Sequence, residues 1–206
     1  MIVKSVIAGI YDANCYIIMD ESTREAVVLD PGGIEPTIER SIDALGAKVK
    51  YILLTHGHVD HVSGVEYLAD KYKVPFYINK IDEEYMEKDN YVFGSIRKAN
   101  GYLNDGDILS FGNHNIKVIH TPGHTKGGLC FLIDDSKLFT GDTLFQGSIG
   151  RTDFIGGNFG EIINSIKTKL LPLGDNVEVY PGHGAMSTIA YEKRNNMYLN
   201  DFDSLI

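Results

Sequence analysis

The sequence predicts an α/β (α+β) protein built as a four-layer αββα sandwich, in which two mixed sheets pack face to face and helices cover both outer sides. Two observations support this prediction. The chain runs twice through strand-like and then helix-like segments, which indicates two similar halves. No low-complexity linker separates these halves, and 206 residues fit one domain over residues 1–206.

In the first half, short apolar segments rich in β-branched residues indicate strands, at 2–7, 15–19, 26–29 and 51–54. Residues Ile38, Ile42 and Leu45 recur at helical spacing, and Gly46 is a natural helix stop. Segment 60–73 has a second apolar stripe at helical spacing. Segment 81–104 is polar, tyrosine-rich and weakly patterned, so we expect a helix and a loop there.

The second half begins with two predicted hairpins, in which turn residues separate strands 108–111 and 116–120, and then strands 129–133 and 137–140. A helical pattern over 162–170 is expected to stop before Pro172. Segment 177–180 reads as a last strand, and the tail from Thr188 looks helical.

Composition narrows the possible partners and location. The 28 acidic and 19 basic residues give a net charge of −9, which argues against a nucleic-acid partner. No apolar run approaches the roughly 18 residues of a membrane span, so no membrane association is expected. The N-terminus lacks a signal-peptide pattern. With only Cys15 and Cys130, we expect a cytoplasmic protein with reduced thiols.

One segment concentrates metal donors. His56, His58, Asp60 and His61 lie within six residues, directly after the predicted strand 51–54 and before a helix. Backbone at such a junction can turn successive side chains toward one point. Neutral imidazoles and carboxylates are preferred ligands of zinc, iron and manganese. The segment therefore predicts a metal site.

Three further donors follow predicted strands in the same way. His124 lies in His-Thr-Pro-Gly-His-Thr, Asp142 in Thr-Gly-Asp-Thr, and His183 in Pro-Gly-His-Gly. The neighbouring glycines permit close backbone approach. Each loop alone is a weak signal, but together they predict strand-end loops that converge on one metal-binding cup.

In this order, the motifs T-H-x-H-x-D-H, H-T-P-G-H-T, G-D and P-G-H-G resemble those of the metallo-β-lactamase superfamily, over residues 55–184. Within it, segments 140–145 and 147–154 are most similar to small glyoxalase II-like hydrolases (the hydroxyacylglutathione hydrolase family). The resemblance implies two divalent metal ions, zinc foremost, with iron or manganese as alternatives. It places the first metal on His56, His58 and His124, the second on Asp60, His61 and His183, and makes Asp142 the bridge.

The resemblance also implies a metal-dependent hydrolase that acts on a small-molecule acyl thioester. Metals lower the pKa of water from ~15.7 toward ~7, and the resulting hydroxide attacks the acyl carbonyl. We expect Asp60, His61 and Asp142 to be the catalytic residues, with Asp60 also orienting the hydroxide. No general acid stands out in the sequence, which favours a thiol leaving group with a pKa near ~8.5.

Several points stay open at this stage. Only 23 residues (206 − 183) follow His183, too few for the C-terminal domain of larger glyoxalase II enzymes, and Asp153 stands where those enzymes have a tyrosine. Arg151 is a candidate substrate-binding residue, or it pairs with Asp153 to brace the loop. His120 is either a support for a ligand or a packed histidine. The oligomeric state is not predicted.

The main alternative is an oxidoreductase of the same fold, a persulfide dioxygenase with a single iron. The resemblance places that iron on His56, His124 and Asp142, which leaves positions open for oxygen. Because this sequence retains donors for two metals, the dinuclear hydrolase is the preferred interpretation.

Overall fold

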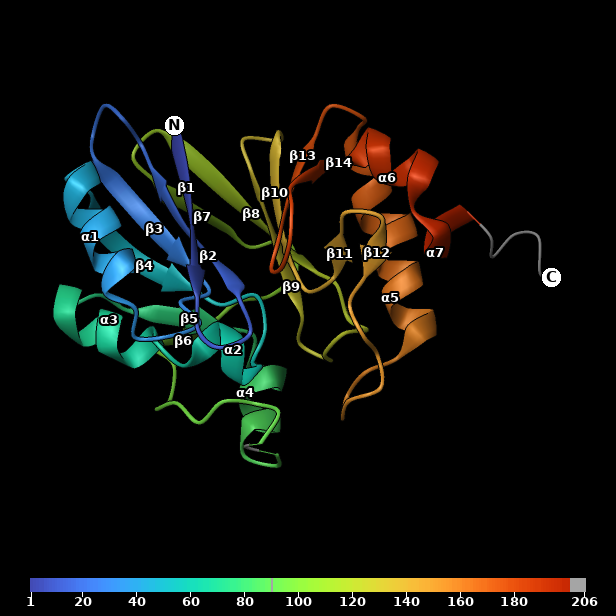
Figure 1. Ribbon diagram of the computed structural model, residues 1–206, viewed down its shortest axis with the longest axis horizontal. Helices are drawn as coiled ribbons and strands as arrows, with labels where there is room; N and C mark the ends of the chain where they lie inside the picture. The colour runs from blue at the N-terminus through green and yellow to red at the C-terminus, as the bar shows by residue number, and fades with distance from the viewer. Residues whose placement is uncertain (90, 201–206) are drawn as a thin grey trace.

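A computed structural model describes residues 1–89 and 91–200. In this part of the chain, two six-stranded sheets form the centre of the molecule (Figure 1). The first sheet has the order β1-β2-β3-β4-β5-β6. Its strands are β1 (Ile2–Ala8), β2 (Ala13–Met19), β3 (Glu25–Leu29), β4 (Lys48–Leu53), β5 (Phe76–Ile78) and β6 (Gly101–Tyr102). The pairs from β1 to β3 are antiparallel and those from β3 to β6 are parallel, so the sheet is mixed.

The second sheet has the order β14-β13-β10-β9-β8-β7 and is also mixed, because β10 and β13 pair in parallel whereas their neighbours are antiparallel. Its strands are β7 (Ile108–Phe111), β8 (His114–His120), β9 (Leu129–Ile133), β10 (Lys137–Gly141), β13 (Glu178–Pro181) and β14 (Ser187–Thr188). A separate small hairpin joins β11 (Leu144–Phe145) and β12 (Ser148–Ile149).

Helices cover the outer faces of both sheets, as Figure 1 shows. In the described part of the chain, four helices accompany the first sheet, and three helices with a π and a 3₁₀ turn accompany the second. They are α1 (Pro36–Leu45), α2 (Val59–Val62), α3 (Val65–Tyr72), α4 (Lys80–Met86), α5 (Phe159–Ser165), the π turn Ile166–Leu170, the 3₁₀ turn Leu171–Leu173, α6 (Ile189–Asn195) and α7 (Met197–Asn200).

Strand β2 shows how the layers are separated, because side chains of a strand alternate between its two faces. Cys15 and Ile17 pack into the cluster under α1 and α3, whereas Tyr16 and Ile18 pack into the cluster between the sheets. A third buried cluster lies between the second sheet and the helices from α5 to α7. These three apolar layers confirm the predicted αββα sandwich.

The predicted strands and hairpins of the second half are confirmed, but some expectations about helices were wrong. The predicted helix over 60–73 is two helices, α2 and α3, with Gly64 between them. A Cβ on Gly64 would lie 2.2 Å from the carbonyl oxygen of Gly33, so only glycine allows this contact. The predicted helix does not end before Pro172. The backbone stays helical through the 3₁₀ turn Leu171–Leu173, in which Pro172 occupies an early position that proline tolerates. Strands β5 and β6 were not predicted.

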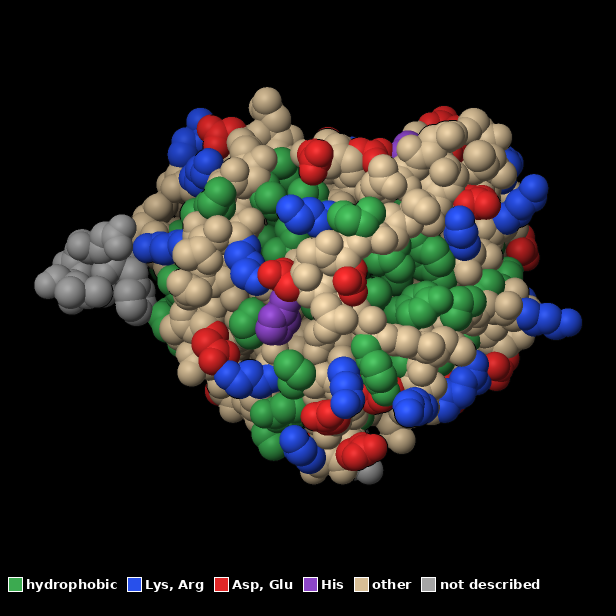
Figure 2. Space-filling model, turned by 180° about the vertical axis from the view of Figure 1, so that it is seen from behind, with side chains coloured by type: hydrophobic (Ala, Val, Ile, Leu, Met, Phe, Trp, Pro, Cys, Tyr) green, Lys and Arg blue, Asp and Glu red, His purple; other side chains and the backbone are tan. Residues whose placement is uncertain are grey.

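Among residues 1–89 and 91–200, no helix combines the length and the apolar character needed to cross a bilayer. On the face drawn in Figure 2, Lys and Arg side chains lie among Asp and Glu side chains. Both cysteines are free and buried.

Candidate metal centre

Seven donor side chains that lie far apart in the sequence meet at one edge of the sandwich. His56 and His58 follow β4, and the four-residue helix α2 contributes Asp60 and His61. The other three follow β8, β10 and β13 in the second sheet: His124, Asp142 and His183. Strand-end loops from both sheets therefore supply the predicted donors.

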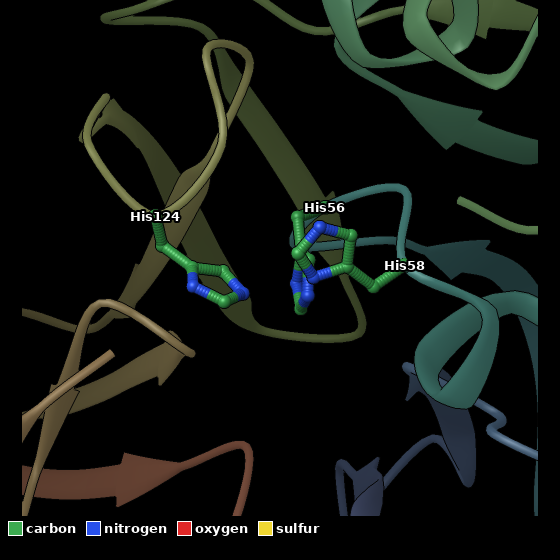
Figure 3. Close-up of side chains that lie close together, drawn as sticks. All are labelled: His56, His58 and His124. Atoms are coloured by element: carbon green, nitrogen blue, oxygen red, sulfur yellow. The ribbon is translucent and has the colours of Figure 1, made fainter. Parts of the chain in front are cut away.

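Three imidazoles form the first donor group. His56, His58 and His124 offer ring nitrogens that all lie within 4.8 Å of one another. In Figure 3 their rings point toward one another, two from the loop after β4 and one from the loop after β8. Three imidazoles at this separation match the ligand set of a zinc-type site with an open position.

The second group consists of Asp60, His61 and His183, whose donor atoms also lie within 4.8 Å of one another. His183 Nε2 is 3.2 Å from Asp60 Oδ2 and 3.3 Å from His61 Nε2. Asp142 lies between the two groups, since its Oδ1 is 3.3 Å from His61 Nε2 and its Oδ2 is 3.6 Å from His124 Nε2. One carboxylate thus faces both groups.

Gly182 makes room for this arrangement. Its backbone nitrogen donates to the carbonyl oxygen of Gly141 at 2.7 Å, which joins the ends of β10 and β13. A Cβ at Gly182 would lie 2.2 Å from Asp142 Oδ1 and 2.8 Å from His61 Cε1. Any other residue would displace one of these donors.

Hydrogen bonds on the far side of the rings fix which nitrogen faces the cluster. His124 Nδ1 donates to the carbonyl oxygen of Arg151 at 2.7 Å, which leaves Nε2 with its lone pair. His61 Nδ1 likewise donates to Asp30 Oδ2 at 3.0 Å. Thr55 Oγ1 donates to the same carboxylate at 2.5 Å and accepts from His56 Nδ1 at 3.0 Å. Three Nε2 atoms are therefore directed inward.

The protonation of the cluster differs between its two parts. Burial lowers the pKa of His56 well below its ordinary value, lowers that of His58 to about 3 and lowers that of His124, so these rings are neutral at pH 7. Burial also acts on His61, but the carboxylates of Asp142 and Asp30 outweigh it and raise its pKa. The neutral imidazoles of His56, His58 and His124 can therefore offer lone pairs to a cation.

Unsatisfied buried atoms show that these residues fit a metal. His56 Nε2, His58 Nε2, His124 Nε2 and Asp142 Oδ1 are buried without a hydrogen-bond partner among the described residues. Leaving a buried polar atom unpaired costs ~1–3 kcal/mol, so four around one point need a common ligand. Metal ions held by the two donor groups would satisfy all four.

Two residues that support the cluster were missed by the sequence analysis. Asp30 was not among the predicted donors, although it follows β3 directly, as the predicted donors follow their strands. Asp82, in α4, is fully buried and accepts hydrogen bonds from the nitrogens of Gly57 and Gly127 and from Thr125 Oγ1. It carries no motif, so no local signal could have identified it.

Arg151, Asp153 and His120, whose roles the sequence left open, are engaged by neighbours outside the two donor groups. Arg151 donates to both carboxylate oxygens of Asp153, at 2.7 and 2.8 Å, and its guanidinium lies 3.7 Å from the centre of the Phe154 ring. His120 Nε2 donates to the carbonyl oxygen of Lys126 at 2.9 Å, which is the contact of a packed histidine. His114 contacts Asp134 away from the cluster.

A pocket of about 420 Å³ opens beside the donors. Five of the seven donors line it: His58, Asp60, His124, Asp142 and His183. Tyr11, Tyr91 and Phe154 are among its walls. The volume suits a small molecule, whose reacting group would reach the donor cluster.

The family model of the metallo-beta-lactamase superfamily matches residues 8–183. The chain belongs to the metallo-β-lactamase superfamily. It is accordingly a metal-dependent hydrolase, and its His/Asp clusters have the composition and spacing to hold metal ions. The resemblance stated from its motifs is thereby confirmed.

Individual superfamily members are similar over nearly the whole chain. The hydroxyacylglutathione hydrolase GloC of Haemophilus influenzae is 38% identical, over 92% of this chain and 94% of its own. The crystal structure of the BLEG-1 B3 metallo-beta-lactamase has a TM-score of 0.89 and 31% identity, over 97% of this chain and all of that one. TTHA1623 in a di-iron-bound form has a TM-score of 0.84 and 31% identity, over 95% of this chain and all of that one.

Proposed function

We propose that this protein hydrolyses a small acyl thioester, of the hydroxyacylglutathione hydrolase type, with two divalent metal ions. We assign one metal to His56, His58 and His124, the other to Asp60, His61 and His183, and a bridging position to Asp142. Zinc is the expected metal, with iron or manganese as alternatives. The similarity to GloC supports the substrate class, and the di-iron form of TTHA1623 supports two metals.

The observation that carries the proposal is the convergence of the two donor groups on one pocket, with buried donor atoms left unpartnered. A hydrophobic core has no use for such atoms, whereas a metal centre requires them. The supports behind the rings keep the donors in place, since Asp30 and the carbonyl of Arg151 hold His61 and His124.

Divalent metals bound there would supply Lewis acidity and lower the pKa of water toward neutrality. The protein residues do the rest. The pocket admits the thioester beside the donors. Asp60, His61 and Asp142 are the proposed catalytic residues. Burial acts to raise the pKa of Asp60, but the hydrogen bond with His183 and the other interactions outweigh it, so the pKa is lowered. Asp60 therefore remains a carboxylate that can orient an attacking oxygen.

The pocket walls favour a thiol as the leaving group. Apart from the metal donors, the described lining residues carry no carboxyl or imidazole group. Their proton-bearing side chains are Tyr11, Tyr91 and Arg151, and phenol and guanidinium groups are weak general acids at neutral pH. A thiol has a pKa near ~8.5 and leaves as a thiolate, whereas an amine needs a proton donor. The site therefore suits a thioester better than an amide.

The proposal extends to location and organisation. We propose that the chain acts in the cytoplasm and that residues 1–206 form a single domain. Two free, buried cysteines agree with a reducing compartment.

The test is hydrolysis of matched thioester, ester and amide substrates by metal-reconstituted protein, with and without a chelator. We expect thioester cleavage that stops on chelation and returns with zinc. Cleavage of none of the substrates by protein that holds two metals would contradict the proposal. One iron per chain with sulfide-dependent oxygen uptake would favour the persulfide dioxygenase instead.

A further inference from the structure

The loop that carries His183 is held by a residue of the first sheet. The backbone nitrogen of Asn14, in β2, donates to the carbonyl oxygen of Gly182 at 2.7 Å. The side-chain Nδ2 of Asn14 donates to the carbonyl oxygens of Pro181 and Gly184, each at 3.0 Å. Asn14 therefore binds the backbone on both sides of His183.

The side chain of Asn14 is fully committed to this loop. Asn14 is 3% exposed, and the two protons of its amide nitrogen match the two carbonyl oxygens that accept from it. Tyr16 lies two residues further along β2, on the same face, and its Oη donates to the carbonyl oxygen of Pro181 at 2.7 Å. Both bonds to Pro181 are buried, so water does not readily replace a lost donor.

The ring of His183 depends on its backbone more than the rings of three other donors do. The Nδ1 atoms of His56, His61 and His124 are hydrogen-bonded, whereas within residues 1–89 and 91–200 the Nδ1 of His183 has no hydrogen bond. The ring of His183 contacts Phe145 edge-on, and its side chain is 27% exposed, against 0% for His61. The position of His183 Nε2 is therefore set mainly by the loop.

Asn14 connects His183 to the half of the fold that carries the other members of its donor group. Asp60 and His61 lie in α2, which packs against β2. His183 follows β13 in the second sheet. The hydrogen bonds of Asn14 therefore hold the third donor at a fixed position relative to the first two.

We propose that Asn14, supported by Tyr16, is a positioning residue that keeps His183 at the second donor group, so that binding of the second metal depends on it. This inference rests on the two-metal centre of the proposed function. In the part of the chain that the structure describes, the hydrogen bonds of Asn14 reach no residue of the first donor group. Loss of Asn14 should therefore weaken one metal and spare the other.

The experiment titrates metal-free protein with Zn²⁺, and in parallel with Co²⁺, in competition with a chromophoric chelator. His183→Ala identifies which of the two stepwise affinities belongs to the second donor group. Asn14→Ala should lower that affinity about 10- to 100-fold and leave the other within about twofold. Two unchanged affinities, or equal losses in both, would overturn the proposal.

Tyr16→Phe is a milder variant that carries the same test if Asn14→Ala does not fold. It removes one donor to Pro181 and keeps the bond from Asn14, so it should lower the second affinity about three- to fivefold. No change in that affinity would contradict the supporting role of Tyr16.

Matched controls separate positioning from stability. Asn79→Ala removes another buried asparagine, whose Nδ2 donates to the carbonyl oxygen of Leu103. Tyr51→Phe removes another hydroxyl that donates from the first sheet to the second, at the carbonyl oxygen of Ser110. Both should lower the stability against urea and leave both metal affinities within about twofold. A selective loss of the second metal in either control would contradict the assignment.

A double variant tests whether Asn14 acts through His183. In the His183→Ala protein, Asn14→Ala should change the remaining metal affinity less than about twofold, because the ligand that Asn14 positions is already absent. A larger loss would overturn the proposal. These titrations need no substrate, so two metals without thioester hydrolysis would contradict the proposed function alone, whereas a wild-type protein that binds one metal would overturn both.

Discussion

The carboxylate of Asp82 accepts a hydrogen bond from the backbone nitrogen of Gly57 at 2.9 Å, although 25 residues separate them. The same carboxylate accepts from Gly127 N at 2.6 Å and from Thr125 Oγ1 at 2.8 Å. Gly57 lies between His56 and His58, and Thr125 follows His124. One buried side chain of α4 therefore fixes the relative positions of the two loops that carry the first donor group.

Asp82→Ala is expected to weaken metal binding about 10- to 100-fold, because the two loops lose their common anchor. Affinity is measured by competition with a chromophoric chelator. Asp20→Ala is the matched control, since Asp20 is also buried and caps backbone nitrogens, those of Ser22 and Asn113. It should lower stability and leave metal affinity unchanged. Equal losses in both variants would show that Asp82 acts only through general stability.

Asp82 also predicts a pH dependence of stability. Burial raises its pKa to about 6, above the ~3.9 of an unfolded chain. The folded state then binds more protons than the unfolded state between about pH 4 and 6, so the free energy of unfolding falls as pH rises through this range. The contribution is on the order of 3 kcal/mol.

Urea denaturation of the metal-free protein at several pH values measures this effect. Asp82→Asn has no titrating carboxyl there, so the difference between wild type and variant isolates the contribution of Asp82. A difference that stays constant from pH 4 to 7 would rule out the raised pKa.

Asp142→Ala and His58→Ala are expected to abolish hydrolysis and to lower the metal content. Asp142 faces both donor groups, so its loss should reduce binding at two sites, whereas His58 belongs to one. Metal analysis with turnover assays distinguishes the variants. His114→Ala, which removes a histidine that contacts Asp134 instead of the cluster, should retain full metal and activity. Wild-type turnover by Asp142→Ala would exclude the bridging role.

Asp153→Asn tests how Arg151 is used. The amide cannot accept both guanidinium bonds as an anion does, so Arg151 becomes available to a substrate carboxylate. We expect KM for the acetyl thioester of 6-mercaptohexanoate to fall about three- to tenfold, with little change for the uncharged acetyl thioester of hexanethiol. The gain should disappear in the double variant with Arg151→Ala. If Asp153→Asn alters both substrates alike, the pair only braces the loop.

Much of the fold and of the donor set was predictable because the signals are local. Short apolar strands and the turn residues between them specify the hairpins of the second sheet, as β9 and β10 with the turn between them show. His56, His58, Asp60 and His61 are close in sequence, and the other donors directly follow strands. The break at Gly64 was not predictable, because it arises from contact with the distant carbonyl of Gly33.

By itself, the sequence determined the layered architecture, the superfamily and which side chains are available as metal donors. The tertiary structure alone decided which nitrogen of each ring faces the cluster, since the partners Asp30 and Arg151 come from other loops. It also decided that Asp82 joins two loops and that Tyr91 and Ile10, from distant segments, line one hollow. The physical reason is that hydrophobic periodicity acts within a segment, whereas hydrogen bonds between loops depend on how the two sheets pack.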